Sequence, residues 1–125
     1  MRLGILGTLS IGVLLVGQVA LAETVKIGFV TTLTGGAGAI GNDMRDAVEL
    51  TLDHLGRKMG NSDVKMFYED DTFKPAVGKQ KTEKLVKKDK VHFVTGYIWS
   101  HVLMASRNSV VGKGPFMITS NAGPG

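Results

Sequence analysis

The chain has 125 residues, a formal net charge of +4, no cysteine and 43% apolar residues, a composition that suits one globular domain and excludes a disordered tail. Its lysines are interleaved with acidic residues at helical spacing, and residues 77–90, where they concentrate, contain no aromatic residue and no recognition motif. The charge pattern therefore indicates a solvated helix face and not a nucleic-acid-binding surface.

The first 22 residues differ from everything after them. Arg2 supplies a short positive region, residues 3–19 are almost wholly apolar, and Ala20-Leu21-Ala22 has the small-x-small pattern of a cleavage site. A transmembrane anchor is the alternative, because the apolar run approaches the roughly 18 to 20 residues that a spanning helix needs. Glycines and a serine interrupt the run, so we expect residues 1–22 to be a signal peptide that is cleaved after Ala22. The lack of cysteine excludes a lipoprotein anchor and fits an oxidising compartment.

From residue 23 onward, β-rich runs alternate with amphipathic stretches. Residues 25–31 are predicted to form a strand, and residues 32–41 a glycine-rich loop. Apolar residues then recur every three or four positions, which predicts a helix with Asn42 as its N-cap and its end near residues 56–60.

The same alternation continues to the end of the chain. Strands are predicted at residues 63–69, 91–95 and 116–119, with a helix opened by Pro75 and another from Ser100 to about Val111. This order predicts an α/β fold, a parallel sheet with right-handed crossovers and helices on both faces. Ligands bind at the carboxyl ends of such strands, which places the candidate loops at residues 32–41, 70–74, 96–100 and 120–125. The chain stops just after a strand, in a glycine-proline run, so we expect a truncated lobe.

Two motifs have both a functional and a structural interpretation. The run from Gly36 to Gly41 fits the dinucleotide pattern G-x-G-x-x-G, but four residues separate it from the strand and its last glycine precedes the predicted N-cap. We therefore expect a ligand-contacting loop there. Glu69-Asp70-Asp71 could bind a metal, but convincing partner residues are missing, and we expect the acids to cap the helix that Pro75 opens. The three histidines lack zinc-binding spacing, and no metal or cofactor is predicted.

The stretch from Gly96 to Ser100 carries the most functional information. Gly96 lets the backbone approach a ligand, Trp99 offers a flat apolar face, and Ser100 can bind a carboxylate through its hydroxyl and the amides of the helix that it caps. The alternative is an N-cap serine beside a core tryptophan. Asn121, Ala122 and Gly123 follow the next strand and offer further donors at the same sheet edge, which favours a binding site.

Several short motifs recur in a characteristic order and spacing, which are Val25-Lys26-Ile27-Gly28, Leu33-Thr34-Gly35 with the glycines through Gly41, Asp70-Asp71 with Pro75, Val94-Thr95-Gly96, Ser100, Ala105, and Pro115 before Ile118. Through these motifs, residues 23–125 resemble the type I periplasmic solute-binding proteins of the leucine/isoleucine/valine-binding kind, which deliver ligands to ABC importers. The resemblance implies an incomplete N-terminal lobe of a two-lobed fold, a periplasmic location and no catalysis.

The resemblance also implies a ligand and a partner. In the family, the serine at the position of Ser100 binds the ligand carboxylate, and the loop matching residues 121–123 adds hydrogen bonds. Trp99 and the Asn-Ala-Gly-Pro segment are similar to the subgroup that binds benzoate-type acids, so an aromatic acid is favoured over a branched-chain amino acid. The implied partners are ABC permease subunits, with membrane contact only through them. A secreted α/β enzyme and a sensory ectodomain are the rival classes.

Overall fold

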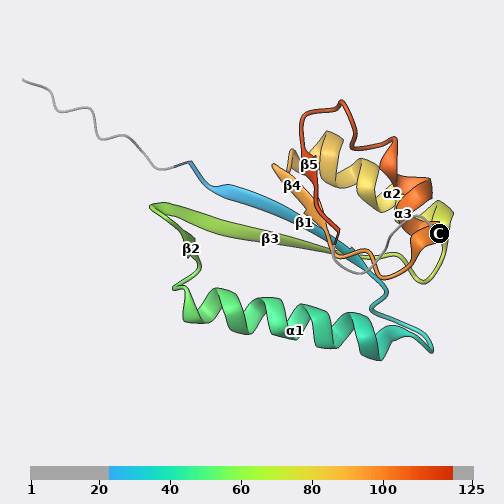
Figure 1. The fold of residues 1–125 in the computed structure, drawn as a ribbon, viewed down its shortest axis with the longest axis horizontal. Helices are drawn as coiled ribbons and strands as arrows, with labels where there is room; N and C mark the ends of the chain where they lie inside the picture. Colours follow the sequence, from blue (N-terminus) through green and yellow to red (C-terminus); the bar gives the residue numbers. More distant parts are fainter. Residues whose placement is uncertain (1–22, 120–125) are drawn as a thin grey trace, which may run out of the picture.

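The structure of the chain is a computed structural model that describes residues 23–119, and the predicted signal peptide and residues 121–123 lie outside this range. Strands and helices alternate along it (Figure 1). They are β1 (Val25–Thr31), α1 (Gly38–His54), β2 (Lys58–Met59), β3 (Ser62–Asp70), α2 (Pro75–Lys84) with its π-helical continuation η1 (Leu85–Asp89), β4 (Phe93–Thr95), α3 (Ser100–Arg107) and β5 (Phe116–Met117).

One five-stranded sheet with the order β2-β3-β1-β4-β5 organises the described residues. β1 pairs in parallel with β3 and with β4, and β4 pairs in parallel with β5, which confirms the predicted parallel α/β fold. β2 was not predicted. It runs antiparallel to β3 at the sheet edge, after a turn in which Gly56 and Arg57 have positive φ angles of 62° and 55°.

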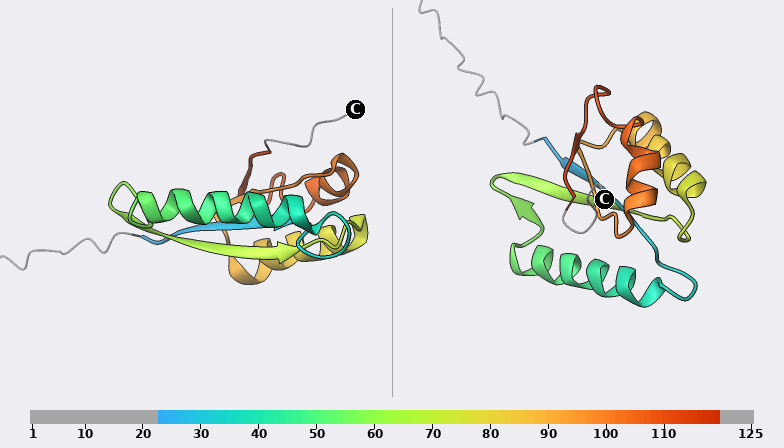
Figure 2. Two further views of the ribbon diagram at one scale, coloured as in Figure 1. Left: turned by 90° about the horizontal axis from the view of Figure 1, so that it is seen from below. Right: turned by 45° about the vertical axis from the view of Figure 1, so that its right-hand side comes forward.

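Helices cover both faces of the sheet, as predicted. α1 lies on one side of the strands, and α2 and α3 lie together on the other (Figure 1; Figure 2). The main core is on the α2/α3 side, where Val30 and Val94 of the sheet are buried with Leu85 of η1, Val102 of α3 and Val110. Burying such aliphatic side chains provides the largest favourable contribution to folding.

The α1 side is packed less completely. Apolar residues of α1, including Val48 and Leu52, face Ile27, Phe29 and Met66 of the sheet across an open hollow of about 550 Å³. None of the helices within residues 23–119 is long and apolar enough to cross a membrane.

Helix boundaries differ from the predicted ones in two places. α1 begins at Gly38 and not after Asn42, whose side-chain amide instead donates to the carbonyls of Leu33 (2.9 Å) and Gly38 (2.8 Å). α3 ends at Arg107, short of Val111, and a turn follows it.

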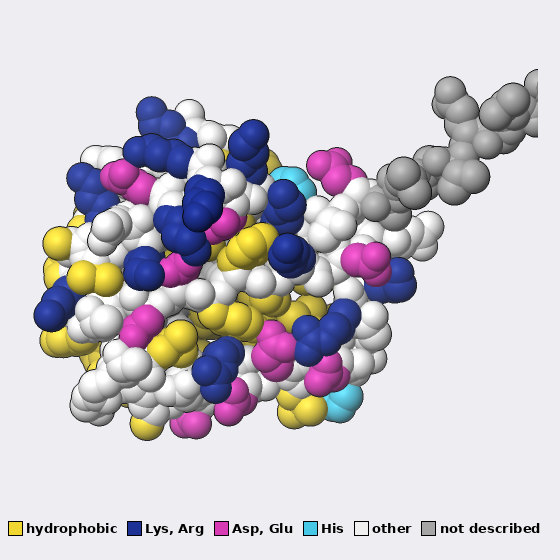
Figure 3. All heavy atoms as spheres, turned by 180° about the vertical axis from the view of Figure 1, so that it is seen from behind, with side chains coloured by type: hydrophobic (Ala, Val, Ile, Leu, Met, Phe, Trp, Pro, Cys, Tyr) yellow, Lys and Arg dark blue, Asp and Glu magenta, His cyan; other side chains and the backbone are white. Residues whose placement is uncertain are grey.

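The lysines of α2 and η1 are spread over their surface among acidic residues, as predicted. Figure 3 shows basic side chains distributed over one face of the molecule with acidic side chains between them. Lys81 and Lys84 both bind Glu69, and Lys87 binds Glu83 at 2.9 Å.

Candidate functional site

The loops that follow β1, β3 and β4 meet at the carboxyl edge of the sheet. They enclose a hollow of about 360 Å³, lined by Thr34, Gly35, Gly36, Ala37, Thr72, Phe73 and Trp99. The prediction that these loops converge is therefore confirmed for three of the four. β5 runs parallel to β4 and ends at the same edge, but residues 120–125 lie outside the described part of the chain.

Trp99 forms one wall of the hollow and is half-buried. Its indole nitrogen donates to the hydroxyl of Thr32 at 3.0 Å, and its ring also packs against the main core. Phe73 meets Trp99 edge to face with 4.8 Å between ring centroids, and the His101 ring lies 5.0 Å from Phe73. Trp99 therefore packs on the core and also lines the hollow, and its contact with a ligand stays a prediction.

The acids at the end of β3 tie two loops together. Asp71 accepts hydrogen bonds from the Thr32 hydroxyl (2.5 Å) and the Phe73 amide (2.9 Å). Asp70 accepts from the Leu33 amide (2.9 Å), the Thr34 hydroxyl (2.5 Å) and a backbone amide of its own turn. The expectation that the acids cap α2 is wrong, because the N-cap of α2 is Lys74 and no side chain caps it.

Hydrogen bonding also sets the charge state of Asp70. Burial acts to raise the pKa of Asp70, but the bonds from Thr34, Leu33 and Thr72 together hold this pKa below its ordinary value. Asp70 therefore stays ionised at neutral pH and holds the loop after β1 against the turn after β3. Residues 23–119 contain no group of three or more acidic, histidine or cysteine side chains that could hold a metal ion.

The turn that carries Phe73 has an unusual backbone. Thr72 and Phe73 have φ angles of 50° and 63°, in the left-handed region that β-branched and aromatic residues seldom adopt. Such residues cost on the order of 1–3 kcal/mol each. The surrounding hydrogen bonds to Asp70 and Asp71 hold the turn in this conformation.

Ser100 is the first residue of α3 and is exposed, while the N-cap is Trp99, so the predicted N-cap role of Ser100 is wrong. Within residues 23–119 its hydroxyl has no hydrogen-bond partner. The backbone amides of Val102 and Leu103 donate to the Trp99 carbonyl, whereas those of Ser100 and His101 have no acceptor among the described residues. A helix start with free amides and a free hydroxyl can receive an anion.

Two glycines explain local packing at this edge. Gly41 lies inside α1, where a β-carbon would come within 1.9 Å of the Thr32 carbonyl oxygen, so its expected position before the helix is wrong. The separation of Gly36 from β1 remains unlike a dinucleotide fingerprint. Gly96, with a φ of 100°, closely approaches the Phe29 ring, and this contact explains why a glycine occurs there.

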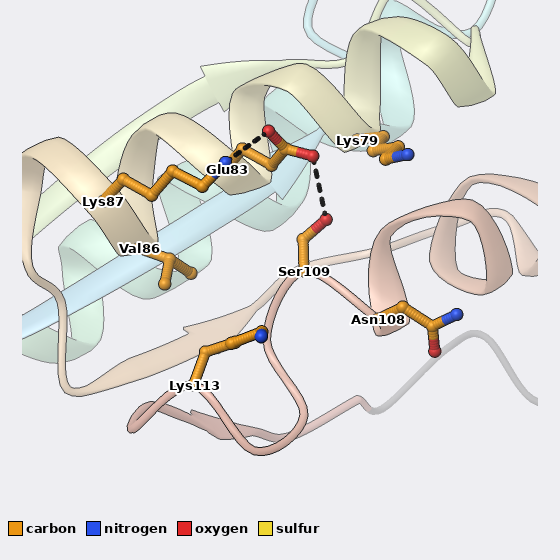
Figure 4. A pocket seen from close by; sticks show the side chains of 7 residues that line it. All are labelled: Lys79, Glu83, Val86, Lys87, Asn108, Ser109 and Lys113. Atoms are coloured by element: carbon orange, nitrogen blue, oxygen red, sulfur yellow. Dashed lines mark hydrogen bonds and ion pairs between the residues drawn. The ribbon is translucent and has the colours of Figure 1, made fainter.

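A second hollow of about 510 Å³ lies between α2, η1 and the turn after α3 (Figure 4). Glu83 sits at its centre and bridges Lys87 (2.9 Å) and Ser109 (3.4 Å). Lys79 and Lys113 also line it. The lining combines exposed lysines with the half-buried Glu83, and ion pairs between such surface side chains contribute little.

Of the five predicted site residues, the structure places only Trp99 in the lining of the hollow. Trp99 lines the hollow, and Ser100 is its chain neighbour but is not part of the lining. Asn121, Ala122 and Gly123 lie outside the described residues, so their role stays a prediction. Phe73 and the threonines at positions 32, 34 and 72 were missed, although their position in loops after β1 and β3 was a signal that could have identified them.

Comparisons with known proteins point to one family. A profile described as periplasmic binding protein matches residues 24–125. Among the similar solved structures is an ABC transporter substrate-binding protein from Sphaerobacter thermophilus, with 31% identity, a TM-score of 0.76, and coverage of 82% of this chain and 28% of that protein. The comparison with curated proteins finds no match.

Two further structures were determined with ligands. A solute binding protein of an ABC transporter from R. palustris, in complex with benzoate, is 26% identical with a TM-score of 0.74, over 80% of this chain and 28% of that protein. The branched-chain amino acid transporter substrate binding protein LivJ from Streptococcus pneumoniae, in complex with isoleucine, has 23% identity and a TM-score of 0.75, over 81% and 30%, and this likeness concerns the fold. The chain therefore spans less than a third of the length of these structures.

Proposed function

Because this chain belongs to the periplasmic binding protein family, we propose that it is part of the extracytoplasmic solute-binding component of an ABC importer. Its ligand is a small carboxylate, with an aromatic acid favoured over a branched-chain amino acid. The observation that carries the proposal is the aromatic hollow at the carboxyl edge of the sheet, where the ring centroids of Trp99 and Phe73 lie 4.8 Å apart. Ser100, whose hydroxyl is free among the described residues, directly follows Trp99 in the chain.

An aromatic acid matches this site in both of its chemical parts. A flat ring can pack against the Trp99 and Phe73 rings, which offer both a face and an edge. The carboxylate can accept from the Ser100 hydroxyl and from the unpaired amides at the start of α3. The benzoate complex of the R. palustris protein supports the same ligand class.

An amino acid fits this half of a site less well. None of the described residues that line the hollow is acidic, so the ammonium group of an amino acid finds no opposite charge there. The nearby Asp70 is occupied by three hydrogen-bond donors. If the ligand were an amino acid, the residues that bind its ammonium group would have to come from outside the described residues.

The binding site is proposed to be completed by a second lobe that closes over the ligand. The chain spans 28% of the length of the S. thermophilus protein, and the hollow is open. The chain alone therefore binds its ligand weakly or not at all. Permease subunits of the importer are the proposed protein partners, and residues 1–22 are the proposed signal peptide for export to the periplasm.

Isothermal titration calorimetry of the whole secreted protein with benzoate, 4-hydroxybenzoate and leucine tests the proposal. Heat is expected with the aromatic acids. Ser100→Ala removes one hydrogen bond to a charged group, which weakens benzoate binding about tenfold or more. Ser109→Ala, in the hollow beyond α3, is the matched control and leaves affinity unchanged. Binding of leucine alone refutes the aromatic assignment, and binding of none of the three refutes the carboxylate receptor.

A further inference from the structure

We propose that Asp71 is a positioning residue that holds both aromatic walls of the hollow in place without touching the ligand. One of its carboxylate oxygens, Oδ1, binds Trp99 indirectly, through the Thr32 hydroxyl, and binds Phe73 directly, through its backbone amide. Neither Asp71 nor Thr32 lines the hollow. The inference deepens the proposed function and rests on it for the identity of the ligand.

The direction of each hydrogen bond follows from the chemistry of the groups. An indole nitrogen can only donate, so the Thr32 oxygen must accept from Trp99 at 3.0 Å. The single hydroxyl proton of Thr32 is then available to Asp71, whose Oδ1 lies 2.5 Å away. The three groups therefore form a hydrogen-bond relay, in which the indole donates to the hydroxyl and the hydroxyl donates to the carboxylate.

Burial makes this relay a strong restraint. Thr32 and Asp71 are both fully buried, and hydrogen bonds to a carboxylate are stronger and shorter than neutral ones. The other carboxylate oxygen of Asp71 is buried without a partner among the described residues. Oδ1 therefore accepts both of the hydrogen bonds that the Asp71 side chain forms within residues 23–119.

The hydrogen bond from the Phe73 amide to Asp71 holds a strained backbone in place. Phe73 has a φ of 63°, and its amide donates to Asp71 at 2.9 Å. Without this acceptor, the turn can relax to an ordinary conformation and the Phe73 ring leaves its edge-to-face contact with Trp99. Asp71 thus fixes the angle between the two rings that the ligand is proposed to meet.

The test uses Trp99, the single tryptophan of the chain, as a spectroscopic probe. Thr32→Val keeps the shape of the side chain and removes the hydroxyl, and Thr32→Ser restores it. Thr51→Val, at an exposed position of α1, is the matched control. In the 125-residue chain, Thr32→Val is expected to raise acrylamide quenching of Trp99 and to lower its fluorescence anisotropy. Thr32→Ser and the control are expected to match the wild type.

In the whole secreted protein, Thr32→Val is expected to weaken benzoate binding about fivefold. This factor corresponds to the loss of the neutral hydrogen bond that holds the Trp99 indole on Thr32. Unchanged Trp99 fluorescence in Thr32→Val overturns the inference. If far-UV circular dichroism shows Thr32→Val unfolded, Asp71→Ala, which removes the acceptor for both hydrogen bonds, replaces it, and an unaltered Trp99 signal in Asp71→Ala then overturns the inference. A wild-type protein that does not bind benzoate refutes the proposed aromatic ligand, while the fluorescence of the variants still decides the role of Asp71.

Discussion

Replacing Gly41 with alanine should destabilise the chain, although alanine is the better helix former. Gly41 lies in the first turns of α1, where the helix passes over the end of β1. A β-carbon at this position would lie 1.9 Å from the Thr32 carbonyl oxygen and 2.7 Å from its carbon. Both atoms belong to the backbone, so no flexible side chain can move aside.

The size of the effect follows from this distance. Ordinary van der Waals contact starts at 3.4 Å, so the helix and the strand end must separate by the difference between 3.4 and 1.9 Å, which is 1.5 Å. Overpacking of this kind costs about 3 kcal/mol, at the upper end of the usual range. Alanine in a helix regains about 1 kcal/mol relative to glycine. The expected net loss in the free energy of unfolding is about 2 kcal/mol.

Urea unfolding followed by far-UV circular dichroism measures this loss. Gly36→Ala is the matched control, because a β-carbon there meets no atom within 4 Å and the φ angle of Gly36 is not positive. Its stability should change by less than about 0.5 kcal/mol. Because Thr32 binds Trp99, Gly41→Ala should also shift Trp99 emission. A Gly41→Ala chain as stable as the wild type would show that the packing of α1 on β1 is not as described.

Three further changes test other parts of the fold. Leu85→Ala removes a fully buried side chain and should lower the free energy of unfolding by about 3 kcal/mol in urea titrations; a loss below about 1 kcal/mol would contradict the described core. Lys90→Gly relieves a left-handed residue with a φ of 52° and should raise the melting temperature, with a gain of up to about 1 kcal/mol that Lys90→Ala does not reproduce. Burial acts to raise the pKa of Glu69, but hydrogen bonds from Lys84 and Lys81 hold it below its ordinary value of 4.5. The stability due to Glu69 is therefore present above pH 4.5 and lost as the pH falls through the lowered folded-state pKa, so Glu69→Gln should flatten the acid limb of a stability titration.

The sheet was predictable because its strands carry the usual signals. β1 is rich in β-branched and aromatic residues, and its alternation with helical patterns indicated parallel pairing. β2 has only two residues and no pattern to detect. The start of α1 was misplaced because Gly38 and Gly41 are poor helix formers, and tertiary packing against the end of β1 overrides their propensity.

The site was predictable in part. Trp99 and the convergence of three loops followed from the rule that parallel strands present ligand loops at their carboxyl ends. The loop that contains Phe73 was predicted, but the left-handed backbone that sets the orientation of its ring was not, because an aromatic residue in a short polar turn gives no sign of that conformation. The pairing of Asp71 with Thr32 joins residues 39 positions apart, and sequence spacing alone does not reveal such a contact.

The left-handed turn at Thr72 and Phe73 has a consequence for engineering this protein. Glycine at position 73 would suit the backbone better, so a screen that selects variants for heat resistance alone should enrich glycine there. The same substitution removes the ring that stands against Trp99. Thermal stability and the proposed ligand recognition are thus opposed at one position, and a library designed to improve both should keep phenylalanine at position 73 unchanged.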